Sequence, residues 1–194
     1  MTDTTFKWPM IILTVAIGFH MMSCSRLMHE STLPSPVKPD MARVYFIFPT
    51  HSAMGVNEGA AYVTEETRLV GFITNRQAFH ADVPPGRHLF MAILSNTEAV
   101  EIDAAAGKTY YVKVVSAPNP IPYGGPVVIV TPLVPGYGEW DMRHKWLAAV
   151  DFMAYDPVKG AKWERKYRER NQERLANIRS GEAGLKPVLP DQGE

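Results

Sequence analysis

The chain has 194 residues, with 20 basic and 20 acidic side chains and a single cysteine, Cys24. This length, less a removable leader, suits one domain with its own core and an appendage. The balanced charge disfavours a general nucleic-acid-binding protein, which would be strongly basic, and one cysteine cannot form an internal disulfide.

Residues 1–23 have the pattern of a lipoprotein signal peptide. A short polar start with Lys7 precedes an apolar run over residues 10–19, which is too short for a lone transmembrane helix because that needs about 20 residues. Met21-Met22-Ser23-Cys24 then fits a bacterial lipobox, with Met21 in place of the more usual leucine. We therefore expect cleavage before Cys24 and lipidation of its thiol, which would anchor the chain to a bilayer. A signal anchor with an incidental cysteine is the alternative.

Residues 24–40 follow the lipobox and contain Pro34, Pro36 and Pro39 without apolar periodicity. Such a segment predicts a semi-extended tether that holds the following domain away from the bilayer. Ser25, directly after the cysteine, resembles the residue at this position in lipoproteins that are not retained in the inner membrane. This resemblance implies the outer membrane, with the domain facing the periplasm.

Residues 41–135 predict a β-sandwich domain. At the centre of residues 43–48 both the odd-numbered and the even-numbered positions are apolar, which is typical of a strand covered on both faces. Further runs with strand character recur at short spacing, separated by proline and glycine, and they predict about eight strands whose two sheets bury each other's apolar faces. These runs are residues 61–63, 68–73, 79–81, 89–91, 100–103, 110–115 and 127–130.

Two turns organise the middle of this domain. Pro84, Pro85 and Gly86 predict a chain reversal that pairs residues 79–81 with 89–91 as a central hairpin. Gly107 starts the second turn, and an aromatic and β-branched run follows it. In that run Tyr110 and Tyr111 point to opposite faces of one strand, so we expect at most one of them in the core.

The same two segments carry a resemblance to known families. The sequence Val-Pro-Pro-Gly-Arg-His-Leu-Phe at residues 83–90, followed by Gly-Lys-Thr-Tyr-Tyr-Val-Lys-Val at residues 107–114, resembles uncharacterised bacterial lipoproteins that carry a domain of unknown function. It is also similar to the PEGA-type surface-layer sandwiches. The resemblance covers residues 42–135 and implies a small β-sandwich in the cell envelope; it carries no catalytic residues across, because none are established for the family.

Residues 136–194 predict a C-terminal helical extension with a loose tail. Met142, Trp146, Val150 and Met153 recur at helical spacing and indicate a first helix. Asp156-Pro157 is typical of an N-cap followed by proline in the first turn, so a second helix is expected to run to residue 179.

The second helix carries the clearest charge signal in the chain. Between residues 159 and 179 there are eight basic and three acidic residues, which suits an anionic headgroup, an acidic protein or a cell-wall polyanion. The alternative is a solvated helix with internal pairs such as Glu164 with Arg168 and Arg165 with Glu169. The candidate partner-contact residues are Lys162, Trp163, Arg165, Lys166, Tyr167, Arg170 and Arg174.

Catalytic chemistry finds little support in the sequence. His80, Asp82 and His88 flank one turn and could in principle bind zinc, but no further ligand stands at a recognisable spacing. No nucleophile elbow, phosphate-binding loop or zinc-protease motif occurs, and we expect no cofactor.

The sequence thus predicts a lipid-anchored envelope protein that acts as a non-enzymatic binding or assembly module with a protein partner. One alternative is an accessory lipoprotein of a secretion or envelope machine, since such proteins often use transthyretin-like sandwiches. A metal-dependent hydrolase using His80, Asp82 and His88 is the other.

Overall fold

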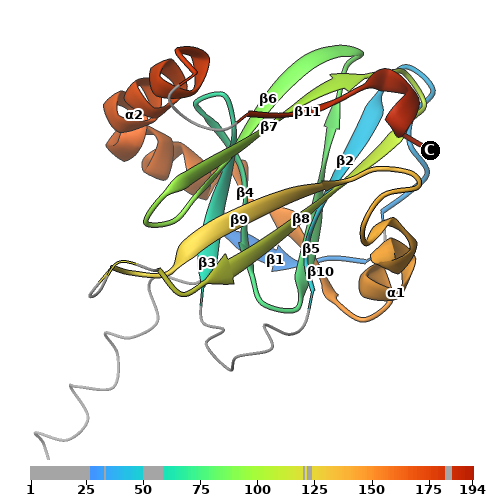
Figure 1. Ribbon diagram of the computed structural model, residues 1–194, viewed down its shortest axis with the longest axis horizontal. Helices are drawn as coiled ribbons and strands as arrows, with labels where there is room; N and C mark the ends of the chain where they lie inside the picture. Colours follow the sequence, from blue (N-terminus) through green and yellow to red (C-terminus); the bar gives the residue numbers. More distant parts are fainter. Residues whose placement is uncertain (1–26, 33, 50–58, 120, 122–123, 182–184) are drawn as a thin grey trace, which may run out of the picture.

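The computed structural model describes residues 27–32, 34–49, 59–119, 121, 124–181 and 185–194; the lipobox and Cys24 lie outside these residues. Within them, eleven strands form two mixed sheets, which confirms the mainly β prediction (Figure 1). The six-stranded sheet contains, in order, β1 (Met28–Glu30), β10 (Asp151–Tyr155), β5 (Gln77–Val83), β2 (Ala42–Phe48), β8 (Thr109–Ala117) and β9 (Val127–Leu133). The five-stranded sheet contains β11 (Leu185–Val188), β7 (Thr97–Ala104), β6 (Gly86–Ile93), β3 (Ala60–Glu65) and β4 (Arg68–Thr74).

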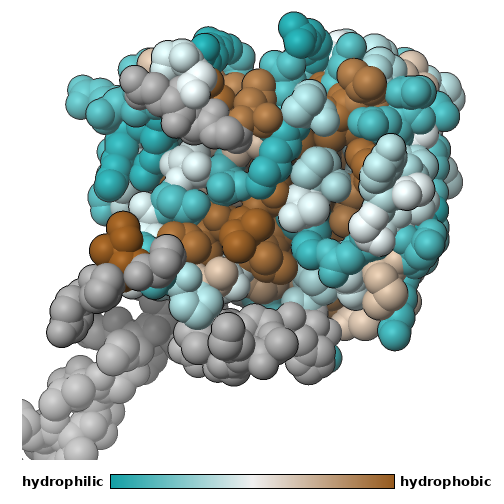
Figure 2. Space-filling view, in the orientation of Figure 1, coloured by the Kyte–Doolittle hydropathy of each residue, from teal (hydrophilic) through white to brown (hydrophobic). Residues whose placement is uncertain are grey.

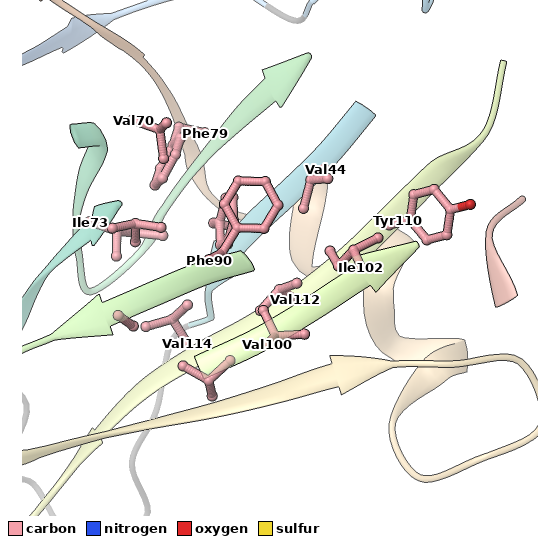
Figure 3. Close-up of a cluster of buried hydrophobic side chains, with 14 of the residues drawn as sticks. Val44, Val70, Ile73, Phe79, Phe90, Val100, Ile102, Tyr110, Val112 and Val114 are labelled. Carbon is pink, nitrogen blue, oxygen red and sulfur yellow. The ribbon is translucent and has the colours of Figure 1, made fainter. Parts of the chain in front are cut away.

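The main core lies between the two sheets (Figure 3). Phe46 of β2 stacks on Phe79 of β5 with ring centroids 5.0 Å apart, and it meets Phe90 of β6 edge-on at 5.2 Å. Phe46, Phe79 and Phe90 are at most 2% exposed, and burial of one such ring stabilises the fold by roughly 1.5–3 kcal/mol. The aromatic residues of three strands therefore join the two sheets.

Strand β2 occupies a central position, as its apolar sequence predicts. It pairs with β5 antiparallel and with β8 parallel, and all of its residues except Tyr45 are buried. The predicted hairpin of residues 61–63 and 68–73 is also confirmed, since β3 and β4 pair antiparallel.

The predicted central hairpin around Pro84, Pro85 and Gly86 is wrong. Strand β5 belongs to the six-stranded sheet and β6 to the five-stranded sheet, so this turn carries the chain from one sheet to the other. Gly86 has a φ of +129°, which only glycine adopts readily. Gly107, with a φ of +73°, lies in another connection between the sheets, from β7 to β8. The sequence predicts the positions of both turns correctly. It does not specify whether the strands on either side of a turn pair with each other or belong to different sheets.

The C-terminal segment differs from the expected amphipathic helix and loose tail. Residues 140–155 contain a 3-10 turn, η1 (Trp140–Met142), a short helix, α1 (Arg143–Leu147), and strand β10. Strand β10 pairs with the open edge of β5 on one side and with β1, from the expected tether, on the other. Unpaired backbone at the β5 edge favours this pairing over the helical periodicity. Strand β11 likewise adds to β7 and buries Val188.

Tyr110 and Tyr111 are both buried, contrary to expectation, at 1% and 6% exposure. The outer face that Tyr111 occupies is covered by η1 and the C-terminal residues. Its ring meets Trp140 edge-on at 5.8 Å, and its hydroxyl donates a 2.5 Å hydrogen bond to Glu194 Oε1. Burial, followed by the Glu194 carboxylate, raises the pKa of Tyr111 above its usual value.

Replacing Gly86 with alanine tests the crossing turn. A Cβ at this position has no neighbour within 4 Å, so the expected cost is backbone strain alone, on the order of 1 kcal/mol or more of unfolding free energy. Urea denaturation measures it. Gly125→Ala is the matched control, because Gly125 lacks a positive φ and its nearest neighbour would be Ser95 Cβ at 3.8 Å. Equal midpoints for the two variants would contradict the strained turn.

Candidate interaction surface on helix α2

Helix α2 (Pro157–Arg179) begins as the sequence predicts. The Asp156 side chain accepts hydrogen bonds from the backbone N–H groups of Val158 and Lys159, at 3.1 and 3.2 Å, and Pro157 occupies the first turn. The Lys159 ammonium, which bonds the same carboxylate, lowers the pKa of Asp156 below its usual value. These contacts satisfy donors that a helix start leaves free.

One face of α2 is fixed to the outer side of the five-stranded sheet (Figure 1). Trp163, Leu175 and Ile178 are buried there, and the Trp163 ring lies 4.8 Å from that of Tyr62 on β3. The alternative of a solvated helix is therefore wrong for this face, and Trp163 is not available as a partner contact. The helix covers apolar sheet residues that would otherwise face water, namely Leu69, Leu89, Met91, Ile93 and Ala99.

The buried face of α2 is difficult to predict from the sequence, because polar and small residues lie within it. Asn171 is fully buried, and its Oδ1 accepts a 2.8 Å hydrogen bond from Arg174. A side chain at Gly160 would place a Cβ 1.6 Å from the Tyr155 hydroxyl oxygen, so only glycine permits this close approach. Burial raises the pKa of Tyr155 to about 12. A glycine in the first turn of a long helix was the one available signal of tight packing.

One of the three acidic residues of α2, Glu164, is engaged by the sheet. Glu164 Oε1 accepts a 2.9 Å hydrogen bond from the backbone N–H of Leu69, on the edge strand β4. Within the described residues, neither Glu164 with Arg168 nor Arg165 with Glu169 forms an ion pair. The ends of the helix do pair, Lys159 with Asp156 and Arg179 with Glu66.

Five exposed cations remain on the middle of α2, and we call them the cationic face. None of them has an ion-pair partner in the described part of the chain, and Figure 2 shows hydrophilic residues along the outer side of the helix. The exposed Glu169 and Glu173 lie on the same side, so five cations and two carboxylates leave a net charge of +3. The cationic face consists of Lys162, Arg165, Lys166, Arg168 and Arg170.

The sequence-predicted contact residues divide accordingly. Lys162, Arg165, Lys166 and Arg170 are exposed, whereas Trp163 is buried and Tyr167 is half-buried beside it. Arg174 is half-buried as well, and burial followed by the nearby Arg170 lowers its pKa. Arg168, absent from the predicted set, belongs to the exposed group.

The structure does not assemble His80, Asp82 and His88 into one site. Asp82 is held by two hydrogen bonds from Arg43, at 2.6 and 2.8 Å, and this guanidinium lowers the pKa of Asp82. His80 lies 3.9 Å from Asp82, and burial lowers its pKa, which favours the neutral ring.

His88 lies on the other sheet, with Nδ1 2.6 Å from Glu65 Oε1 and Nε2 2.8 Å from the Pro84 carbonyl oxygen. Across the described residues, no three His, Cys, Asp or Glu side chains are grouped so that they could hold a metal ion.

Two further findings bear on identity. No helix in the described ranges has both the length and the apolar character needed to cross a membrane. Comparison with known protein families and with curated proteins finds no family model and no curated protein that matches this chain.

Replacing Glu164 with alanine tests whether this carboxylate anchors the helix to the sheet. The change removes the acceptor for the Leu69 N–H, which is expected to cost about 1–2 kcal/mol of unfolding free energy. Glu169→Ala is the matched control, because it changes the net charge equally from an exposed position on the same helix. Urea denaturation measures the unfolding free energy of both variants. An equal loss of unfolding free energy in Glu169→Ala and Glu164→Ala would contradict the role of Glu164 as an anchor.

Proposed function

We propose that this protein is a lipid-anchored component of the bacterial cell envelope, a non-enzymatic binding module that contacts an anionic partner through the cationic face of α2. The observation that carries the proposal is the state of those five cations: they are exposed, and no acidic side chain of the described residues pairs with them.

The mounting of the helix supports a binding role over simple solvation. Trp163, Leu175 and Ile178 hold α2 against a rigid sheet, so the cationic face keeps one orientation. Glu164, which could neutralise a neighbouring arginine, bonds the backbone of β4 instead. A fixed surface of net positive charge attracts anionic partners and raises their rate of association. An open hollow on this surface is lined by Arg165, Lys166, Arg168 and Glu169.

The anchor is tested at Cys24. Replacement of Cys24 by alanine removes the thiol that would carry the diacylglycerol, so incorporation of labelled palmitate is expected to be abolished. Intact mass measurement of the full chain from cells checks both versions. Undiminished palmitate in Cys24→Ala would overturn the lipid anchor.

The contact surface is tested by photo-crosslinking in cells, with an unnatural photo-reactive amino acid at Gln172. This exposed position lies four residues from Arg168 and seven from Arg165 and so shares their side of the helix. We expect adducts from Gln172 that the double variant Arg165→Glu, Arg168→Glu loses, because charge reversal repels an anionic partner.

Two matched controls accompany this experiment. The same probe at exposed Asp141 in η1 reports non-specific contacts, and the double variant Lys38→Glu, Arg76→Glu makes the same charge change at exposed positions outside α2. Adducts that are equally abundant from Asp141, or that survive the reversal on α2, would place the contact elsewhere on the domain.

A further inference from the structure

We infer that the anionic partner of the cationic face is the surface of the bilayer that holds the anchor, so that α2 lies against anionic phospholipid headgroups beside Cys24. This inference rests on the lipid anchor of the proposed function and adds the identity of the partner.

The first described residue of the chain lies at the start of α2. The carbonyl oxygen of Leu27 accepts a 2.9 Å hydrogen bond from the backbone N–H of Asp156, the N-cap of the helix. The Leu27 side chain packs against the cluster formed by α2 and the five-stranded sheet. Strand β1, which follows directly, pairs with β10 from Met28 opposite Tyr155 to Glu30 opposite Met153.

Chain length then limits the distance between the anchor and the helix. Cys24 precedes Leu27 by three residues, and three extended residues span at most about 11 Å. The part of the predicted tether (residues 24–40) that contains its three prolines lies beyond β1, a strand of the same range that is already fixed in the sheet. It cannot separate the domain from the bilayer, and the start of α2 is held close to the lipid surface.

The order of side chains along α2 fits such a surface. Val158, in the first turn, is 83% exposed, and it precedes Lys162 by four residues and Arg165 by seven, so the three share one side of the helix. At 1.5 Å per residue, the five cations lie about 9–21 Å from Asp156 along the helix axis. An apolar residue nearest the anchor followed by a band of cations is the arrangement that suits the interface of an anionic membrane.

Lysine reactivity on vesicles tests the inference with side chains that the chain already has. The mature protein, which begins at the acylated Cys24, is reconstituted into vesicles of phosphatidylcholine alone or of phosphatidylcholine mixed with phosphatidylglycerol. A water-soluble acetylating reagent is applied and the modified sites are quantified by mass spectrometry. Lys145 on α1 is the internal control, because α1 and α2 lie at opposite ends of the domain (Figure 1).

In the phosphatidylglycerol vesicles we expect the reactivity of Lys162 and Lys166, relative to Lys145, to fall about fivefold or more, the factor that one cation near an anionic surface is worth. Phosphatidylcholine alone should give no such protection, and high salt should remove it. The double variant Arg165→Glu, Arg168→Glu keeps both reporter lysines and should lose their protection, whereas Lys38→Glu, Arg76→Glu should retain it.

The outcomes separate the two proposals. If Cys24 carries acyl chains but Lys162 and Lys166 react as fast as Lys145 on phosphatidylglycerol vesicles, the bilayer is not the partner and the anchor stands. Protein adducts from Gln172 in cells would then identify the occupant of the cationic face. If the mass of the full chain shows no acyl group on Cys24, the anchor fails, and the inference fails with it.

Discussion

The structure depends on one constraint: two sheets present four faces, and each needs cover. The inner faces cover each other through Phe46, Phe79 and Phe90. Both outer faces are apolar as well, with Ile47 and Tyr111 on one sheet and Leu69 and Met91 on the other. The chain beyond β9 supplies what is missing, since η1 and α1 cover the first outer face and α2 covers the second. The C-terminal third is therefore part of the packing of the sandwich.

The same segment also satisfies sheet edges that would otherwise expose unpaired backbone. Strands β10 and β11 extend one edge of each sheet, and Glu164 accepts the N–H of Leu69 on the edge strand β4. Residues near the C-terminus then join the two sheets. Lys186, on the strand that pairs with β7, donates a hydrogen bond to the carbonyl oxygen of Val130 on β9. The Tyr110 hydroxyl on β8 donates a hydrogen bond to the carbonyl oxygen of Pro190. Backbone and side-chain hydrogen bonds thus stabilise the sandwich in addition to the burial of apolar side chains.

Features that depend on a few neighbouring residues could be predicted from the sequence, and features that depend on distant partners could not. The Asp156 cap and the turn at Gly86 follow from local geometry and were located correctly. The pairing of β10 could not, because its partners on β5 lie more than 70 residues away and the spacing of apolar residues around β10 itself indicates a helix. The charge of the candidate surface was evident from composition. The burial of Trp163 and the hydrogen bond from Leu69 to Glu164, across 95 residues, appear only in the folded chain.

That hydrogen bond explains why the charge of α2 forms a surface. A free helix of this composition would rotate and would pair its carboxylates with its arginines. Docking instead buries Trp163 and directs Glu164 to the sheet, which leaves a net charge of +3 on the outer side. The hydrogen bond from Asp156 to Leu27 fixes the start of α2 to the segment that follows Cys24. An acylated Cys24 and the cationic face would then share one frame, so attachment to the bilayer would orient the domain as well as tether it.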